Sequence, residues 1–207
     1  MSTISRMVIL LSAMSLLFLT NCISFSTLQS VETLEPGTVS ISAGMATLVE
    51  DGEPAGILPE LGMRYGLTDR IDVGAKIFLP AALFIDTKVE LIQKPVTVSF
   101  DLGYSMLQIN SGSGESKYQM NALYPMLMVG QKHWYVGYKT IFVATDGDFN
   151  VFGTSSDATE SLHFANDFVM GVVVGKRLRL LPEVNILFSP DWETSIVIPA
   201  MGVELKF

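Results

Sequence analysis

Residues 57–79 read ILPELGMRYGLTDRIDVGAKIFL, and apolar side chains occupy alternate positions in two successive runs of this stretch. The first run is Ile57, Pro59, Leu61, Met63, Tyr65 and Leu67, and the second is Ile71, Val73, Ala75, Ile77 and Leu79. Small or charged residues fill most of the positions between them. A period of two places one row on each face of a β-strand, so the stretch predicts a β-hairpin with its turn at Asp69-Arg70.

The same period continues through most of the chain from Val39 to Phe207. It predicts ten strands, at about 38–49, 55–68, 70–79, 83–93, 96–109, 118–131, 134–146, 163–176, 178–189 and 194–207. Eight or twelve strands are the alternatives. No segment after residue 37 has the 3.6-residue period of a helix, so the expected fold class is all-β and antiparallel.

The length and composition suit one domain, or at most two small ones, without a nucleic-acid partner. The chain has 207 residues, of which 49% are hydrophobic and 16% charged, and its net charge is -8. Because a phosphate backbone needs a basic face, this acidity disfavours nucleic-acid binding. A single cysteine excludes a disulfide framework and a cysteine-based zinc site. We therefore expect no metal and no cofactor.

The N-terminus has the pattern of a secretory signal. Residues 7–19 form a 13-residue run of apolar residues and two serines, too short for a membrane-spanning helix, which needs roughly 20 apolar residues. The run ends in Leu19-Thr20-Asn21-Cys22. This motif resembles the lipobox of bacterial lipoproteins, although Asn21 stands where Gly, Ala or Ser is usual. The resemblance implies a signal peptide over 1–21, lipidation of Cys22 and a linker over 22–37 before a barrel domain over 38–207. The alternative is a plain signal peptide with an incidental cysteine.

The alternating strands fit two folds. In a soluble sandwich the apolar rows form the core, whereas in a membrane barrel they face lipid and the polar rows face the lumen. Here the polar rows contain many glycines, which suit a narrow interior, and charges of both signs, which would pair there. The predicted lumen charge network is Glu60, Arg64, Asp72, Lys76, Asp86, Lys88, Glu90, Asp101, Lys139, Glu183 and Glu204.

The connections between the expected strands alternate in character. Counted along the chain, most odd-numbered connections are acidic, and the longest of them spans about 146–162. The even-numbered connections are short and mostly basic, as in Lys132-His133 and Lys176-Arg177. Short turns at one end and longer loops at the other are typical of outer-membrane barrels, in which the short turns are periplasmic.

Two segments resemble bacterial outer-membrane barrel proteins. The C-terminal MGVELKF (201–207) is similar to their terminal strand, which ends in Phe and is read by the assembly machinery. The hairpin at 63–76 resembles a periplasmic hairpin common in such barrels. The resemblance implies an assembly signal at Val203, Leu205 and Phe207, and both termini on the periplasmic side of a bacterial outer membrane. The implied partners are outer-membrane lipid and the machineries for lipoprotein processing and barrel assembly.

Catalytic motifs are sparse, and the sequence favours a protein that is not an enzyme. The candidates are His163, Ser161 and Glu160, because a Ser–His–carboxylate group on one strand could form a relay. Outer-membrane lipid A deacylases resemble this in carrying such a group on a small barrel. Omptin-type proteases of the outer membrane use ten strands with paired Asp and His at the rim.

The sequence therefore predicts a lipid-anchored outer-membrane β-barrel with a structural or surface-interaction role and a largely plugged polar lumen. One alternative is a narrow channel for small solutes or ions. Another is an outer-membrane hydrolase of lipid A or peptide that uses His163, and a soluble periplasmic β-lipoprotein is a third.

Overall fold

The computed structural model of the protein describes residues 26–50, 53–78, 82–110, 117–146, 160–189 and 195–207. Its strands are β1 (Val39–Glu50), β2 (Glu53–Thr68), β3 (Ile71–Phe78), β4 (Ala82–Ile92), β5 (Thr97–Asn110), β6 (Lys117–Gln131), β7 (Trp134–Asp146), β8 (Glu160–Val172), β9 (Val174–Gly175), β10 (Leu178–Phe188) and β11 (Ile196–Lys206). The described residues include no helix long and apolar enough to cross a membrane.

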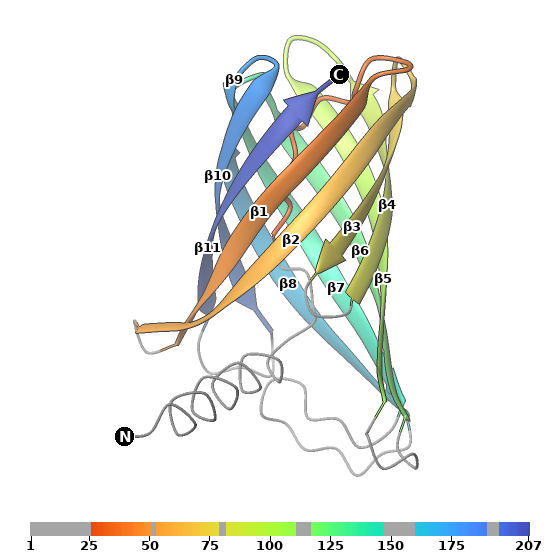
Figure 1. Ribbon diagram of the computed structural model, residues 1–207, viewed down its shortest axis with the longest axis vertical. Coiled ribbons are helices and arrows are strands. Elements are labelled where there is room, and N and C mark those ends of the chain that lie inside the picture. The colour runs from red at the N-terminus through yellow and green to blue at the C-terminus, as the bar shows by residue number, and fades with distance from the viewer. Residues whose placement is uncertain (1–25, 51–52, 79–81, 111–116, 147–159, 190–194) are drawn as a thin grey trace, which may run out of the picture.

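The strands form one closed antiparallel barrel (Figure 1). Each long strand pairs with the next along the chain, and β11 pairs with both β10 and β1, which closes the sheet. The β1–β11 register runs from Ser40 opposite Lys206 to Ala46 opposite Ala200. The two-residue β9 only extends the edge of β10, so ten strands make up the wall. The predicted all-β antiparallel barrel of ten strands is confirmed.

The two ends of the barrel differ. One end, here called the turn end, carries the short connections β2–β3, β4–β5, β6–β7 and β8–β10, together with the start of β1 and the end of β11 (top of Figure 1). The opposite end, here called the loop end, carries the other connections. Exposed cations occur in each of the four short connections, at Arg70, Lys94, Lys132, Lys176 and Arg177.

The outward-facing rows of the wall are apolar. Large apolar side chains are exposed on every long strand, among them Ile41, Leu61, Ile85, Leu102 and Leu127. The alternate rows are mostly buried inside the ring of strands. A soluble protein rarely exposes so continuous an apolar surface, and a closed barrel leaves no unpaired strand edge in a membrane. The wall is therefore built to sit in an apolar medium, with its polar rows toward the axis.

An arginine placed on the apolar face tests this arrangement. Leu61 lies near the middle of β2 and is 56% exposed, whereas Leu67 lies close to the turn end and is 50% exposed. We expect Leu61→Arg to lower the free energy of unfolding by about 2–4 kcal/mol and Leu67→Arg by about 0–1 kcal/mol, because the cost of a lipid-facing charge depends on depth. Urea unfolding in lipid vesicles measures both. Equal losses at the two positions would contradict a bilayer around β2.

Candidate functional site

The inner face of the wall carries charged side chains of both signs. All eleven residues of the predicted lumen network are buried: Glu60, Arg64, Asp72, Lys76, Asp86, Lys88, Glu90, Asp101, Lys139, Glu183 and Glu204. Asp167 on β8 and Arg179 on β10 are buried as well. Buried charges persist only when they are paired and hydrogen-bonded, so each of these groups needs a partner in the lumen.

The densest group of charges centres on Arg64. Its guanidinium lies between two carboxylates, with Nη2 2.5 Å from Asp72 Oδ1 and Nη1 2.8 Å from Asp86 Oδ1. Lys88 Nζ approaches Asp72 Oδ2 at 3.4 Å from the other side. Gly74 leaves room for the guanidinium, because a Cβ there would lie 2.8 Å from Arg64 Nη1. Two cations and two carboxylates thus neutralise one another across β2, β3 and β4.

The remaining ion pairs join neighbouring strands. They are Lys76–Glu60 at 3.8 Å, Lys139–Asp167 at 2.8 Å and Arg179–Glu204 at 3.4 Å. Lys139 and Asp167 are direct partners in the β7–β8 register, and Arg179 and Glu204 are direct partners in the β10–β11 register. Opposite charges at such positions stabilise the pairing of the strands.

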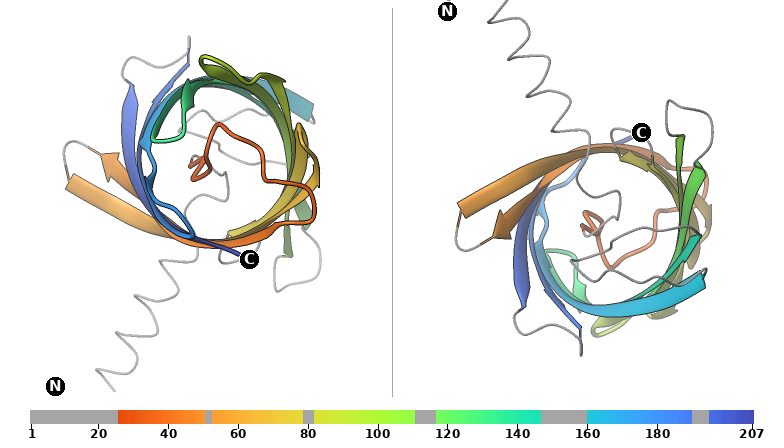
Figure 2. Two further views of the ribbon diagram at one scale, coloured as in Figure 1. Left: turned by 90° about the horizontal axis from the view of Figure 1, so that it is seen from above. Right: turned by 90° about the horizontal axis from the view of Figure 1, so that it is seen from below.

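Residues 26–35, here called the plug, lie inside the barrel (Figure 2). Every residue from Ser26 to Val31 is buried. The chain rises from the level of Glu60 and Glu183, in the middle of the wall, to the turn end, where the Gly37 amide donates to the Gly66 carbonyl oxygen. The sequence predicts a linker over 22–37. Its described part instead fills the turn-end half of the lumen.

Side chains of the wall form hydrogen bonds with backbone carbonyl groups of the plug. Lys88 Nζ donates to the carbonyl oxygens of Ser30 at 2.9 Å and Glu32 at 3.0 Å, and Lys76 Nζ donates to that of Thr27. Ser99 Oγ donates to Val31 O at 2.6 Å. A buried backbone group without a partner costs about 1–3 kcal/mol, so these contacts make the lumen a specific seat for a peptide.

Glu183 receives the deepest part of the plug. The consecutive amides of Thr27 and Leu28 donate to its Oε1 and Oε2 at 2.6 and 2.8 Å. Leu28 has a φ of 42°, uncommon for a residue with a side chain, and this turn helps both amides converge on one carboxylate. The arrangement resembles the backbone nests that bind anions. Tyr135 donates its hydroxyl to the same carboxylate.

The side chain of Leu28 fits a notch in the wall. Gly44 on β1 and Gly202 on β11 are partners in the strand register, so the wall has no side chain at this point. A Cβ at Gly44 would lie 2.3 Å from Leu28 Cδ1, and a Cβ at Gly202 would lie 3.2 Å from it. The two glycines therefore accommodate the plug rather than a neighbouring strand.

Filling that notch should unseat the plug. We expect Gly44→Val to displace Leu28 and raise the sensitivity of the plug to protease at least severalfold, because a Cβ at position 44 would lie only 2.3 Å from Leu28 Cδ1 and the valine adds two further methyl groups there. Ala43→Val, one position along β1 with its side chain outward, is the matched control and should change nothing. Limited proteolysis of the folded protein, read by mass spectrometry, measures the difference. If protease cut the plug equally slowly in both variants, the claim that Gly44 makes room for Leu28 would be contradicted.

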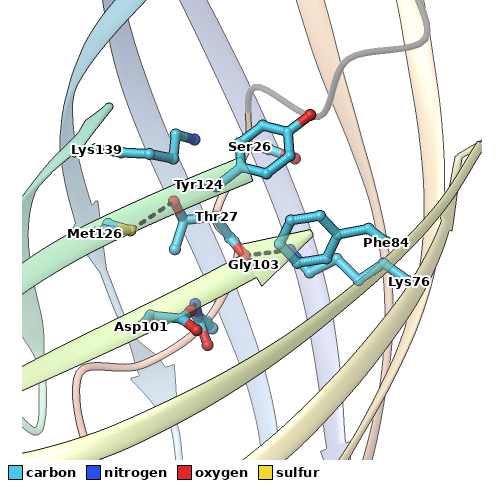
Figure 3. A pocket seen from close by; sticks show the side chains of 10 residues that line it. Ser26, Thr27, Lys76, Phe84, Asp101, Gly103, Tyr124, Met126 and Lys139 are labelled. Carbon is cyan, nitrogen blue, oxygen red and sulfur yellow. Dashed lines mark hydrogen bonds between the residues drawn. The ribbon is translucent and has the colours of Figure 1, made fainter. Parts of the chain in front are cut away.

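A small cavity of about 20 Å³ remains between the plug and the wall (Figure 3). It is lined by Thr27, Gln29, Lys76, Asp101 and Lys139, among others. Such a space holds about one water molecule, and Asp101 Oδ1 and Gln29 Oε1 are buried acceptors without a hydrogen-bond partner. A bound water would satisfy them.

The lumen is not polar on all sides. The described inner row of β6 carries no charge and is mostly apolar, with Met120, Ala122, Tyr124, Met126 and Met128. Phe84 packs edge-on against Tyr124 with ring centroids 5.3 Å apart. The lumen is therefore polar, as predicted, only where the inner rows carry ionic side chains. The inner face of β6 gives the plug an apolar surface, and Leu28 and Val31 belong to the same hydrophobic cluster as this surface.

The other predicted site residues lie elsewhere. Val203, Leu205 and Phe207 are exposed at the outward face and end of β11, and their role in assembly stays a prediction. The backbone of Glu160, Ser161 and His163 runs along β8 opposite Asp146, Thr145 and Val143, but their side chains lie outside the described part of the structure. Cys22 also lies outside it. Among the described residues, no group of three or more His, Cys, Asp or Glu side chains could hold a metal ion.

Sequence reasoning missed the plug and several wall residues that complete the site. Asp167 alternates in phase with the buried Ala165 and Val169, and this period could have placed it in the lumen. Arg179 follows closely on the basic turn pair Lys176-Arg177 in the sequence, but it is buried and faces inward at the start of β10. The sequence offered one signal that could have indicated the plug. The predicted lumen network contains more acidic than basic residues, so its carboxylates need further hydrogen-bond donors from elsewhere in the chain.

No protein-family model matches the chain, and no curated protein sequence matches it. Solved structures of bacterial barrels are similar in architecture. The NanC porin has 11% identity and a TM-score of 0.46, and the similarity covers 82% of this chain and 100% of NanC. The N-terminal barrel of Pseudomonas aeruginosa OprF has 12% identity and a TM-score of 0.39, covering 84% and 100%. Ail of Yersinia pestis has 12% identity and a TM-score of 0.30, also covering 84% and 100%.

Proposed function

We propose that the protein is a bacterial outer-membrane β-barrel with a structural or surface-interaction role, whose lumen is kept closed by the plug. The observation that supports this is the seat of residues 26–35 on the inner wall. Eight of the wall's ionisable or hydroxyl side chains bond the plug directly: Glu60, Asp72, Lys76, Lys88, Glu90, Ser99, Asp101 and Glu183. A segment held by so many partners closes a narrow lumen in the resting protein.

The outer-membrane location is supported by the outward apolar rows and by the contrast between the two ends. In barrels of this type the short turns are periplasmic. The turn end would then face the periplasm, and the C-terminus, which lies at that end, would face it too (Figure 1). The narrow-channel alternative differs from this proposal only in the state of the lumen.

Conductance of the full chain tests the closed lumen. We expect the folded protein to shift its electrophoretic mobility on boiling, as a barrel does, and to give no steady current in planar lipid bilayers. A peripheral lipoprotein would show no mobility shift. A full chain that folds and conducts steadily would overturn the closed lumen in favour of the channel.

Lipidation of Cys22 is a further part of the proposal, and the plug constrains it. Cys22 precedes Ser26 by four residues, so at most about 14 Å of chain separates them. Ser26 bonds Glu60, whose strand continues for eight residues to Thr68 at the turn end, a rise of about 20 Å along a tilted wall. Acyl chains on Cys22 could therefore reach a membrane surface at the turn end only after the plug leaves its seat.

Limited proteolysis tests this constraint, with the intact mass of the mature protein distinguishing acylated from non-acylated molecules. We expect acylated protein, if it is anchored at the turn end, to show a plug that protease cuts, and non-acylated protein to show a protected plug. Full protection of the plug in acylated protein would contradict an anchor at the turn end.

A further inference from the structure

The charges of the lumen wall do not balance. Among the described residues the buried wall carries eight carboxylates and five basic side chains. The ion pairs of these residues engage all five bases and the carboxylates of Glu60, Asp72, Asp86, Asp167 and Glu204. Three buried carboxylates, those of Glu90, Asp101 and Glu183, have no place in those pairs. The buried wall thus holds three more carboxyl groups than basic side chains.

The plug meets each of the three. The Thr33 amide and hydroxyl donate to Glu90 Oε2 at 3.1 and 2.9 Å, and Gln29 Nε2 donates to Asp101. The amides of Thr27 and Leu28 donate to Glu183, as described above. The plug therefore supplies neutral donors at the positions where the wall lacks cations. Its withdrawal would leave these carboxylates without most of their partners.

We propose that the lumen behind the plug is a path for small monovalent cations, which replace the plug's donors at Glu90, Asp101 and Glu183 when the plug is withdrawn. This inference rests on the proposed closure of the lumen by the plug. Glu90 and Asp101 come from the adjacent strands β4 and β5, whereas Glu183 faces the axis from β10 on the other side of the ring of strands. They also mark successive levels from the turn end to the middle of the barrel, as the order of their plug contacts shows.

The lumen, once the plug is withdrawn, has a width that suits the passage of ions one after another. Eight-stranded barrels are filled by their own side chains, and barrels of 16–18 strands hold an aqueous channel. This ten-stranded wall has room for one peptide segment, so withdrawal of the plug would vacate a path no wider than that segment. Several carboxylates in sequence give weak, repeated binding, which conduction requires. A lining of one net sign raises the local concentration of counter-ions about tenfold or more.

The reversal potential of an unplugged barrel tests the inference. The probe is a KCl gradient across a planar bilayer that holds a variant lacking residues 26–35. We expect a potassium-to-chloride permeability ratio of about ten. Neutralising the three carboxylates together, by Glu90→Gln, Asp101→Asn and Glu183→Gln, should bring the ratio close to one. As single changes, Asp101→Asn should lower the ratio, and Asp69→Asn, at an exposed carboxylate in the β2–β3 turn, should leave it unchanged.

A second variant covers the case in which the deletion does not fold. Leu28→Asp in the full chain puts a carboxylate beside Glu183 and into the glycine notch, and should expel the plug without shortening the chain. Current without cation preference in either variant would overturn the cation path and leave the plug intact as a closure. Silence in a variant that is folded, as judged by its mobility shift, would overturn the closure itself.

Discussion

A barrel without residues 26–35 should conduct where the full chain is silent, and this is the largest change we expect from any variant. The plug occupies the turn-end half of the lumen and is buried from Ser26 to Val31. Its removal takes away no strand and no ion pair of the wall. The wall should therefore still close, and the current per channel should rise from undetectable to a steady step in planar bilayers.

A synthetic peptide supplies the control for this deletion. A peptide with the sequence of residues 26–37 can restore the bonds to Glu183, Lys88 and Ser99, whereas the same composition in scrambled order cannot. We expect only the native-order peptide, added from the turn end, to block the current of the deletion variant. Equal block by both peptides would mean that the lumen selects for size alone and would contradict a specific seat.

Loss of Arg64 should cause the largest fall in stability. Its guanidinium bonds Asp72 and Asp86, and it is about 7% exposed. Arg64→Met keeps much of the volume but leaves two buried carboxylates with Lys88 as their remaining base, at 3.4 Å from Asp72. Breaking a buried pair by removing one partner costs about 3–5 kcal/mol, and we expect a loss of that size. Urea unfolding of the vesicle-embedded protein measures it.

Two comparisons separate this charge effect from a loss of packing. Arg70→Met changes an exposed arginine in the neighbouring turn and should alter the free energy of unfolding by about 0.5 kcal/mol or less. Adding Asp86→Asn to Arg64→Met should recover part of the loss, because one uncompensated carboxylate is removed. If Arg64→Met were as mild as Arg70→Met, Arg64 would not hold the wall together.

The wall of this barrel could be predicted from the sequence because its signal is local. Along β2, β4 and β5 an apolar residue alternates with a small or charged one, and the alternation alone places each side chain inside or outside. The predicted strands therefore agree with the observed ones to within a few residues. The largest difference is at the eighth strand, predicted at 163–176, where β8 begins at Glu160 and ends at Val172.

The plug could not be predicted because its partners are remote and it has no strand period of its own. Leu28 and Glu183 are 155 residues apart, and Gln29 and Asp101 are 72 apart. Its backbone bonds go to side chains of the wall rather than to a neighbouring strand, so no ladder pattern marks it. The apolar inner row of β6 was missed for a related reason, since Met126 and Met128 face inward while Leu123 and Leu127 face outward, and apolar residues on both faces weaken the contrast between the rows.

The central claim is that the apolar rows face outward into lipid, and quenching of tryptophan fluorescence by brominated lipids tests it most directly. Phe84 and Ile85 are adjacent on β4 at nearly the same depth, with exposed fractions of 8% and 50%. Each is replaced by Trp in a chain in which Trp134 and Trp192 are Phe, and the protein is folded into vesicles with bromine on the acyl chains. We predict strong quenching of the Trp at position 85 and little at position 84. Strong quenching at position 84 with none at position 85, or none at either, would contradict a barrel whose apolar rows face lipid.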